Sequence, residues 1–401
     1  MEKGTSRTPT ILAITLSLVT LSTLLITPSL PDIAATLHTD AGDVQTLITI
    51  YLFSFAVCQL VFGALCDQIG RKPILVAGLV LFTGASILCG FAPSLNFLIG
   101  GRAIQACGAS ASVVSVYAIL RDTNDASGFA KAGATMALVT GAIPGLAPIL
   151  GGLLGQWYGW RGNFFLLAFV ALFLLVVATI ASIETTHTKQ RANLLDMIGS
   201  YASLLKNPRF LCQMLSIGSV VGGLYTYNAG IPFLLREISG GSTATAGLVT
   251  SLSVPSFLLG SLLGRLLLNR FAPEVLALLG VAICALGGVL FVTVMFTGYL
   301  TVPTTVAAFS IFAAGMGMSV PNIMASGLRH VDKNAGSGSA LMGLAQTLGG
   351  TTYTFALSVA LEQAVTTLPI LILIAGVVAM LAFSISLMVS RTENQLIVGK
   401  N

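Results

Sequence analysis

The chain has 401 residues, of which 55% are hydrophobic and 8% are charged. Soluble domains carry about 25% charged residues, and disordered chains are poor in apolar ones. The composition therefore excludes both classes and makes lipid the solvent for most of the chain. The net charge of +5 comes without a long basic run, so we expect no nucleic-acid partner.

The apolar residues are gathered in long stretches. A membrane-spanning helix needs about 20 mostly apolar residues, and twelve such stretches follow one another. We therefore expect an all-α membrane protein with twelve transmembrane helices in two six-helix bundles. The predicted spans are 10–30, 44–66, 74–92, 95–120, 132–155, 163–183, 210–235, 245–268, 275–297, 303–326, 335–361 and 369–390.

The longest polar stretch, 184–209, separates the sixth span from the seventh. It predicts an N-terminal bundle over 1–183, a cytoplasmic linker over 184–209 and a C-terminal bundle over 210–401. With the N-terminus inside, the inner loops and termini hold 16 of the Lys and Arg residues, and the outer loops hold only Arg161 and Arg236. Because cytoplasmic loops are rich in Lys and Arg, we expect both termini in the cytoplasm.

Six cysteines lie in or at the edge of apolar stretches, with no CxxC pair among them. They are expected to be small buried hydrophobes rather than a zinc site or a disulfide framework. The sequence has no G-x-x-x-x-G-K-[ST] phosphate-binding loop, which argues against ATP-driven transport. We expect no metal, no other cofactor and no enzymatic activity.

The segment 63–73 after the second span reads GALCDQIGRKP. Gly63 allows close helix packing, and Gly70 permits a tight turn. Asp67 falls at a helix C-terminus, where the helix dipole disfavours a carboxylate, so it needs a cationic or helix N-terminal partner. The segment resembles the cytoplasmic signature of the major facilitator superfamily, G-x-L-x-D-x-x-G-R-K-x. That resemblance implies a cytoplasmic latch between the second and eleventh spans, carried by Asp67 and Arg71 with Gly63, Gly70 and Lys72.

The fourth span reads RAIQACG over 102–108. Spacing places Arg102 and Gln105 on one helix face. An intramembrane arginine costs roughly 2.5 kcal/mol or more unless it faces a cavity or a partner; the alternative is that Arg102 snorkels to the outer interface. The pattern resembles the fourth-span motif of the superfamily, which implies a place for Arg102 and Gln105 in the cavity or the proton path.

The fifth span reads GAIPGLAPILGG over 141–152. Its small residues and prolines predict a bent helix with a smooth packing face, and ordinary close packing would explain them. The spacing nevertheless resembles the antiporter motif of drug exporters in the bicyclomycin/chloramphenicol-resistance branch. The residues in that motif are Gly141, Pro144, Gly145, Pro148, Gly151 and Gly152. Segments TPSLPDIA (27–34) and NAGSGSALMGLAQ (334–346) resemble the same branch.

One position departs from the branch, which usually has an acid where this chain has Leu24. The absence of a mid-membrane carboxylate favours a neutral or anionic substrate. Hydroxyls and amides in spans one, seven, ten and eleven are candidates for substrate binding, although they could instead bond to their own helices or to neighbouring ones. These candidates are Thr20, Thr23, Thr27, Tyr225, Tyr227, Asn228, Asn322 and Gln346.

The resemblance implies a secondary active transporter of the bacterial inner membrane, working by alternating access. We expect proton-coupled efflux of a small amphipathic compound, drug-like or siderophore-like, by a monomer whose partners are that small molecule, protons and the lipid bilayer. An importer or uniporter of a small metabolite is the nearer alternative. A non-transporting membrane receptor or sensor is the alternative from a different class.

Overall fold

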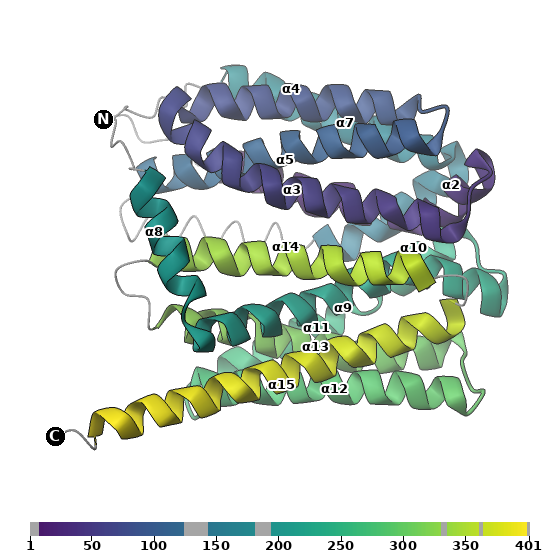
Figure 1. Ribbon diagram of the computed structural model, residues 1–401. Helices are drawn as coiled ribbons and strands as arrows, with labels where there is room; N and C mark the ends of the chain where they lie inside the picture. The colour runs from purple at the N-terminus through teal and green to yellow at the C-terminus, as the bar shows by residue number, and fades with distance from the viewer. Residues whose placement is uncertain (1–7, 124–142, 181–193, 330–334, 361–363, 399–401) are drawn as a thin grey trace. The chain divides into compact units, whose positions relative to one another are not determined.

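A computed structural model describes residues 8–123, 143–180, 194–329, 335–360 and 364–398. Every regular element in these ranges is helical, which confirms the predicted all-α class (Figure 1). The helices are α1 (Thr8–Leu24), the 3-10 helix η1 (Thr27–Ser29), α2 (Leu30–Leu37), α3 (Ala41–Ile69), α4 (Arg71–Gly90), α5 (Leu95–Thr123), helix 143–158, α7 (Trp160–Ile180), α8 (Leu194–Leu205), α9 (Pro208–Ser239), α10 (Thr243–Ser251), α11 (Val254–Leu267), α12 (Pro273–Phe296), α13 (Val302–Leu328), α14 (Ala335–Ala360) and α15 (Ala364–Val398).

Ten helical stretches of the described residues are long and apolar enough to cross a membrane. They coincide with ten of the twelve predicted spans. Helix 143–158 covers the described part of the predicted fifth span, and α14 covers the predicted eleventh over 26 residues. Helix is therefore present at each of the twelve predicted positions.

The helices group into two compact units. The first contains α1 to α7 and α10. The second contains α8, α9 and α11 to α15. The predicted bundle boundaries stay a prediction, and the grouping differs from them in two helices. α10 lies with the first unit although its residues belong to the predicted second bundle, and α8 lies with the second unit although its residues belong to the predicted linker.

In the first unit, α4 packs against both α5 and α7 (Figure 1). Glycine makes the approach of α4 and α5 possible: a Cβ added at Gly108 would lie 2.5 Å from the backbone nitrogen of Phe82, and one at Gly78 would lie 2.8 Å from the Gly108 carbonyl oxygen. Small residues let helices pack backbone to backbone in this way.

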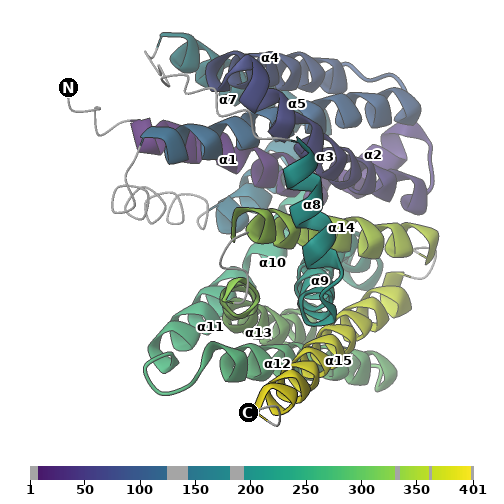
Figure 2. The same ribbon diagram turned by 60° about the vertical axis from the view of Figure 1, so that its left-hand side comes forward.

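Glycine also allows close helix packing in the second unit. α12 lies along α13 and α15 (Figure 2). A Cβ at Gly287 would lie 2.5 Å from the Phe312 nitrogen, and one at Gly315 would lie 2.5 Å from the Gly280 carbonyl oxygen. In both units, dispersion contacts between closely packed backbones hold helices together where lipid removes the hydrophobic driving force.

Two predicted spans are broken rather than continuous. After α1 ends at Leu24, the chain continues through η1 and α2, which carry Pro28 and Pro31 in their first turns. The predicted eighth span is divided at residues 252–253 into α10 and α11, and Pro255 stands in the first turn of α11. Proline lacks the amide hydrogen that would continue the preceding helix, so both breaks have a local cause.

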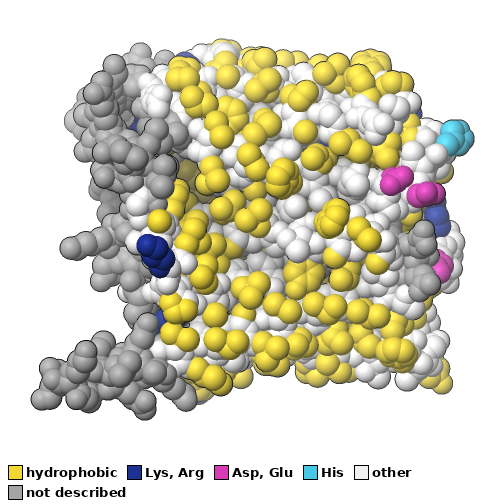
Figure 3. Space-filling view, in the orientation of Figure 1, with side chains coloured by type: hydrophobic (Ala, Val, Ile, Leu, Met, Phe, Trp, Pro, Cys, Tyr) yellow, Lys and Arg dark blue, Asp and Glu magenta, His cyan; other side chains and the backbone are white. Residues whose placement is uncertain are grey.

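Large apolar side chains face outward along the helices. On α11, Leu258, Leu262 and Leu266 are exposed at a spacing of four residues, and on α7 Phe169 and Phe173 are exposed in the same way. Figure 3 shows hydrophobic side chains over the middle of the helices, with the visible charged side chains near helix ends. Surfaces of this kind need an apolar solvent, as the composition predicts.

Candidate functional site

The turn between α3 and α4 carries the predicted latch. α3 ends at Ile69 and α4 begins at Arg71, so Gly70 alone makes the turn, with φ 115°. Only glycine adopts that conformation without strain. A Cβ added at Gly63 would meet no described atom within 4 Å, so the close packing expected at Gly63 is not seen in this structure.

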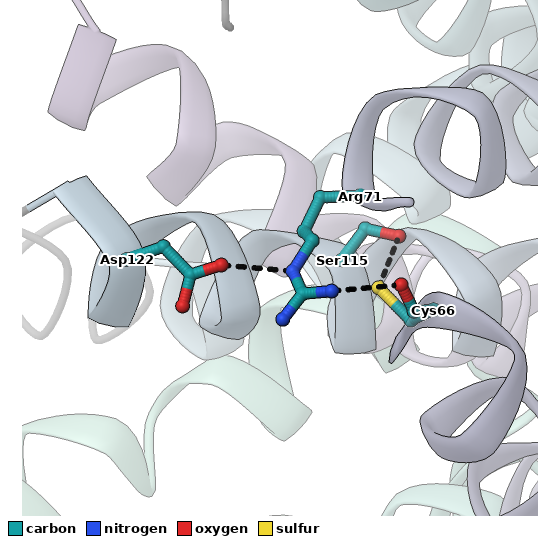
Figure 4. A network of polar contacts seen from close by, with 4 residues as sticks. All are labelled: Cys66, Arg71, Ser115 and Asp122. Carbon is teal, nitrogen blue, oxygen red and sulfur yellow. Dashed lines mark hydrogen bonds and ion pairs between the residues drawn. The ribbon is translucent and has the colours of Figure 1, made fainter. Parts of the chain in front are cut away.

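Arg71 joins three helices at this turn (Figure 4). Its Nε donates to Asp122 Oδ2 on α5 at 2.8 Å, and its Nη1 donates to the Cys66 carbonyl oxygen on α3 at 3.1 Å. The two charged side chains are 14% and 27% exposed. Cys66 Sγ also donates to Ser115 Oγ on α5 at 3.8 Å. The cationic residue of the predicted latch is therefore anchored inside the first unit.

The other latch residues lie close by. Lys72 Nζ donates to the Thr179 carbonyl oxygen on α7 at 3.3 Å. Asp67 lies in the last turn of α3, but its side chain is outside the described residues. The sequence analysis missed Asp122. The signal was available, because an aspartate in the last turn of a span opposes the helix dipole and needs a cation, as was argued for Asp67.

Arg102 on α5 is completely buried. Its Nη1 donates to Gln105 Oε1 at 2.5 Å and to the Ser22 carbonyl oxygen at 3.3 Å, and its Nε donates to the Leu47 carbonyl oxygen at 3.4 Å. The guanidinium carbon lies 4.0 Å from the centre of the Tyr51 ring. Arg102 thus does not snorkel to an interface; it connects α1, α3 and α5.

Neighbouring polar groups hold these partners in place. Gln105 Nε2 donates to Ser86 Oγ on α4 at 2.6 Å. Ser22 Oγ donates to the Tyr51 hydroxyl at 2.6 Å. The predicted pairing of Arg102 with Gln105 is thus part of a larger network. The sequence analysis missed Ser22, Tyr51 and Ser86 because they come from three other helices, and no spacing rule links them to α5.

The electrostatics of this network are unusual. Every contact of Arg102 among the described residues is with a neutral group, and its Nη2 has no hydrogen-bond partner there. A buried arginine without a carboxylate partner is costly. The site therefore holds a positive charge with one buried donor group, Nη2, that has no partner among the described residues.

The fifth-span motif forms a packing surface. Gly141 lies outside the described residues, and Pro144 and Gly145 are half-buried. A Cβ at Gly151 would overlap the Leu25 carbonyl at the end of α1, and one at Gly152 would lie 2.7 Å from the Thr243 carbonyl oxygen on α10.

On the same surface, the Pro148 carbonyl faces Gly247 of α10 so closely that a Cβ there would overlap it. The structure thus gives these small residues a packing role against α1 and α10.

α10 also contacts the end of the first span. Thr243 Oγ1 donates to Asp32 Oδ2 at 2.5 Å, and α10 packs against η1. Asp32 is half-buried and lies in the candidate span Leu12–Leu37. The contact joins a carboxylate of α2 to a segment that is continuous in sequence with α11 of the second unit.

Two of the hydroxyls predicted in the first span donate hydrogen bonds to nearby backbone carbonyl oxygens of the same span. Thr23 Oγ1 donates to the Val19 carbonyl oxygen at 3.0 Å, and Thr27 Oγ1 donates to that of Leu24 at 2.9 Å. Both side chains are buried, and Thr20 is half-buried. Self-bonding of this kind is the common fate of threonine in a membrane helix.

The predicted amides of the second unit behave in the same way. Their side-chain nitrogens donate to the backbone four residues earlier: Asn228 to Leu224 at 2.8 Å, Asn322 to Met318 at 2.7 Å and Gln346 to Met342 at 3.4 Å. One N–H of each amide is therefore bonded within its own helix, and among the described residues none of the three shows a side-chain bond to a neighbouring helix.

The two predicted tyrosines of α9 differ in burial and in ring contacts. Tyr225 is half-buried, whereas Tyr227 is completely buried and stacks on Phe309 of α13, with ring centres 3.5 Å apart. Phe309 in turn stacks on Phe312. The Tyr227 hydroxyl has no hydrogen-bond partner among the described residues. The sequence analysis found Tyr227 but missed the phenylalanines, which look like ordinary core residues in a sequence.

The fold and the sites together define a polytopic membrane protein with an ion-paired turn between α3 and α4 and a buried arginine network. The model of the major facilitator superfamily matches residues 12–354. The chain therefore belongs to the major facilitator superfamily, and it is a transporter by class.

Similar proteins agree with this class. The chain is 26% identical to "Multidrug resistance protein D" of Escherichia coli (strain K12), over 80% of this chain and 81% of that protein. It is 29% identical to "Multidrug resistance protein MdtL" of Salmonella typhi, over 80% of each. A solved D-xylose-proton symporter has the same fold, with a TM-score of 0.76 at 15% identity over 94% of this chain and 96% of that one.

Proposed function

We propose that the chain is a proton-coupled exporter of small amphipathic compounds that are neutral or anionic. Support for export comes from the two relatives above, which are named as multidrug resistance proteins. Support for the substrate charge comes from Arg102, the observation that carries the proposal. We further propose a monomer in the bacterial inner membrane with both termini in the cytoplasm.

The Arg102 network disfavours cations. A permanent cation about 6 Å from the guanidinium would be repelled by roughly 3 kcal/mol at an effective dielectric constant near 20. That energy corresponds to about a hundredfold in affinity. An anionic or neutral substrate would not meet this repulsion, so the same charge favours anionic and neutral ligands over cations.

Asp32 is the residue we propose for proton coupling. Among the acids whose side chains the structure describes, Asp122 and Glu274 pair with arginines, and Asp40, Asp43 and Glu237 are exposed. Asp32 is half-buried and accepts a hydrogen bond from Thr243 on α10. A proton on its carboxyl group would replace an ionic acceptor by a weaker neutral one, so protonation would weaken the contact with α10.

The test compares efflux of an ethidium-like permanent cation with that of a neutral antibiotic from vesicles, each with and without a pH gradient. We expect gradient-driven export of the neutral compound and little export of the cation. Vesicles that contain the same protein but have no pH gradient are the control for passive leak of each compound. Strong gradient-driven export of the cation with no export of the neutral compound would contradict the proposal.

A further inference from the structure

Two cysteines of the first unit lie side by side. Cys58 is on α3 and Cys107 is on α5, and their Sγ atoms are 2.8 Å apart. Both side chains are half-exposed, whereas Cys66, Cys89 and Cys284 are buried. A disulfide bond is about 2.05 Å long, so the two sulfur atoms need to move only about 0.8 Å closer to reach bonding distance.

We propose that Cys58 and Cys107 form a redox-modification site at which a membrane-permeant two-electron oxidant joins the two thiols in a disulfide between α3 and α5. Two S–H bonds break and one S–S bond forms. Both hydrogens, with their electrons, pass to the oxidant. A diazenedicarboxamide takes them on its N=N bond and becomes the corresponding hydrazine, so the reaction needs no other reactant.

The surroundings of the pair determine which oxidants reach it. Cys58 lies within the candidate span Ala41–Gly63, and Cys107 lies within Leu95–Leu120. The neighbouring side chains of Val57 and Ile104 are each 46% exposed. The approach to the thiols is therefore apolar, and an uncharged reagent dissolved in the membrane can follow it. A charged reagent cannot do so without a large desolvation cost.

The bond would add to contacts that already join the two helices. Two turns further along, Cys66 of α3 contacts Ser115 of α5. Cys58 and Cys107 have the same separation in sequence, 49 residues, as Cys66 and Ser115. The two contacts therefore follow one regular packing seam, and a disulfide would join helices that are already aligned.

The experiment uses the full-length protein in membrane vesicles. After treatment with the diazenedicarboxamide, the protein is denatured, alkylated with a maleimide and mapped by peptide mass spectrometry. We expect loss of alkylation at Cys58 and Cys107, a linked peptide pair containing both residues, and recovery of both thiols after reduction. A charged oxidant added outside the vesicles should leave both thiols alkylatable.

Cysteine variants distinguish a disulfide between Cys58 and Cys107 from oxidation of other thiols. In Cys58→Ser the oxidant should leave Cys107 open to alkylation, and in Cys107→Ser it should leave Cys58 open. Cys212→Ser, which removes a half-exposed cysteine of the second unit, should still give the linked peptides. Full alkylation of both residues after oxidation, or protection of Cys107 in the Cys58→Ser variant, would overturn the proposal.

Discussion

Replacing Arg102 by lysine keeps the buried charge but removes the planar guanidinium. The side chain makes three hydrogen bonds, at 2.5, 3.3 and 3.4 Å, and lies over the Tyr51 ring. A lysine ammonium is a compact charge on a flexible stem and cannot reproduce the planar fork of donors. We assume that it retains one of the three acceptors.

The magnitude follows from the contacts that are lost. The two longer hydrogen bonds contribute about 1 kcal/mol each, below the roughly 1.5–3 kcal/mol usual for charged donors because both are long. Part of the cation–π contact adds about 1 kcal/mol in a desolvated site. The total of about 3 kcal/mol corresponds to roughly a hundredfold change in an equilibrium constant.

The assay must distinguish weaker folding from weaker transport. We expect Arg102→Lys to lower the melting temperature of the purified protein and also to lower efflux of a neutral antibiotic per inserted molecule, because the network that joins α1, α3 and α5 is weakened. Arg161→Lys is the matched control. Arg161 lies over the Trp160 ring at 4.2 Å and donates to the Ala92 carbonyl oxygen at 3.1 Å, but it is half-buried near a helix end. Efflux by Arg102→Lys at the original rate per molecule would refute this argument.

Two further predictions concern the latch and the glycine surface. Arg71→Ala and Asp122→Asn should each slow transport without preventing insertion. Because the two side chains form one ion pair, the double variant should be no slower than the slower single variant. Additive losses of the efflux rate would contradict this prediction. Gly151→Ala should lower the melting temperature by an amount corresponding to about 1–3 kcal/mol, since its Cβ would overlap a backbone carbonyl. Gly63→Ala, whose Cβ would meet no described atom within 4 Å, is the control and should melt like the unaltered protein.

The fold was predictable because each span obeys a single strong constraint. In lipid every backbone polar group must bond within its own helix, so a long apolar stretch has few alternatives. The breaks at Pro28 and Pro255 also had a local signal, since each proline opens a new helical turn. Hydropathy averaged over a whole span conceals such a signal, and the eighth span was therefore predicted as continuous.

The candidate sites were predictable only where their residues are close in sequence. Spacing placed Gln105 beside Arg102, but it could not supply Tyr51 from a helix 51 residues away. The sequence also does not determine which acceptor receives the hydrogen bond of a buried side-chain amide. Asn322 bonds its own helix at Met318, and the same amide could have bonded a neighbouring helix with equal chemical satisfaction.

Asp32 and Thr243 allow the role of a proton to be separated from the role of a hydrogen bond. Asp32→Asn removes the titratable group but leaves a carbonyl oxygen that can still accept from Thr243 Oγ1. Thr243→Val removes the donor and leaves the carboxyl group in place. If Asp32 couples proton movement to transport, Asp32→Asn should abolish the stimulation of efflux by a pH gradient, while Thr243→Val should retain it.

A purely structural contact predicts a different outcome. The hydrogen bond contributes about 1.5–3 kcal/mol when its acceptor is charged, so Thr243→Val should then impair transport more than Asp32→Asn, and neither variant should change the dependence on the gradient. Efflux rates measured at several external pH values, with protein amounts equalised, decide between the two cases. Gradient stimulation of normal size in Asp32→Asn would show that the proton moves through another group, because no titratable oxygen would remain at that position.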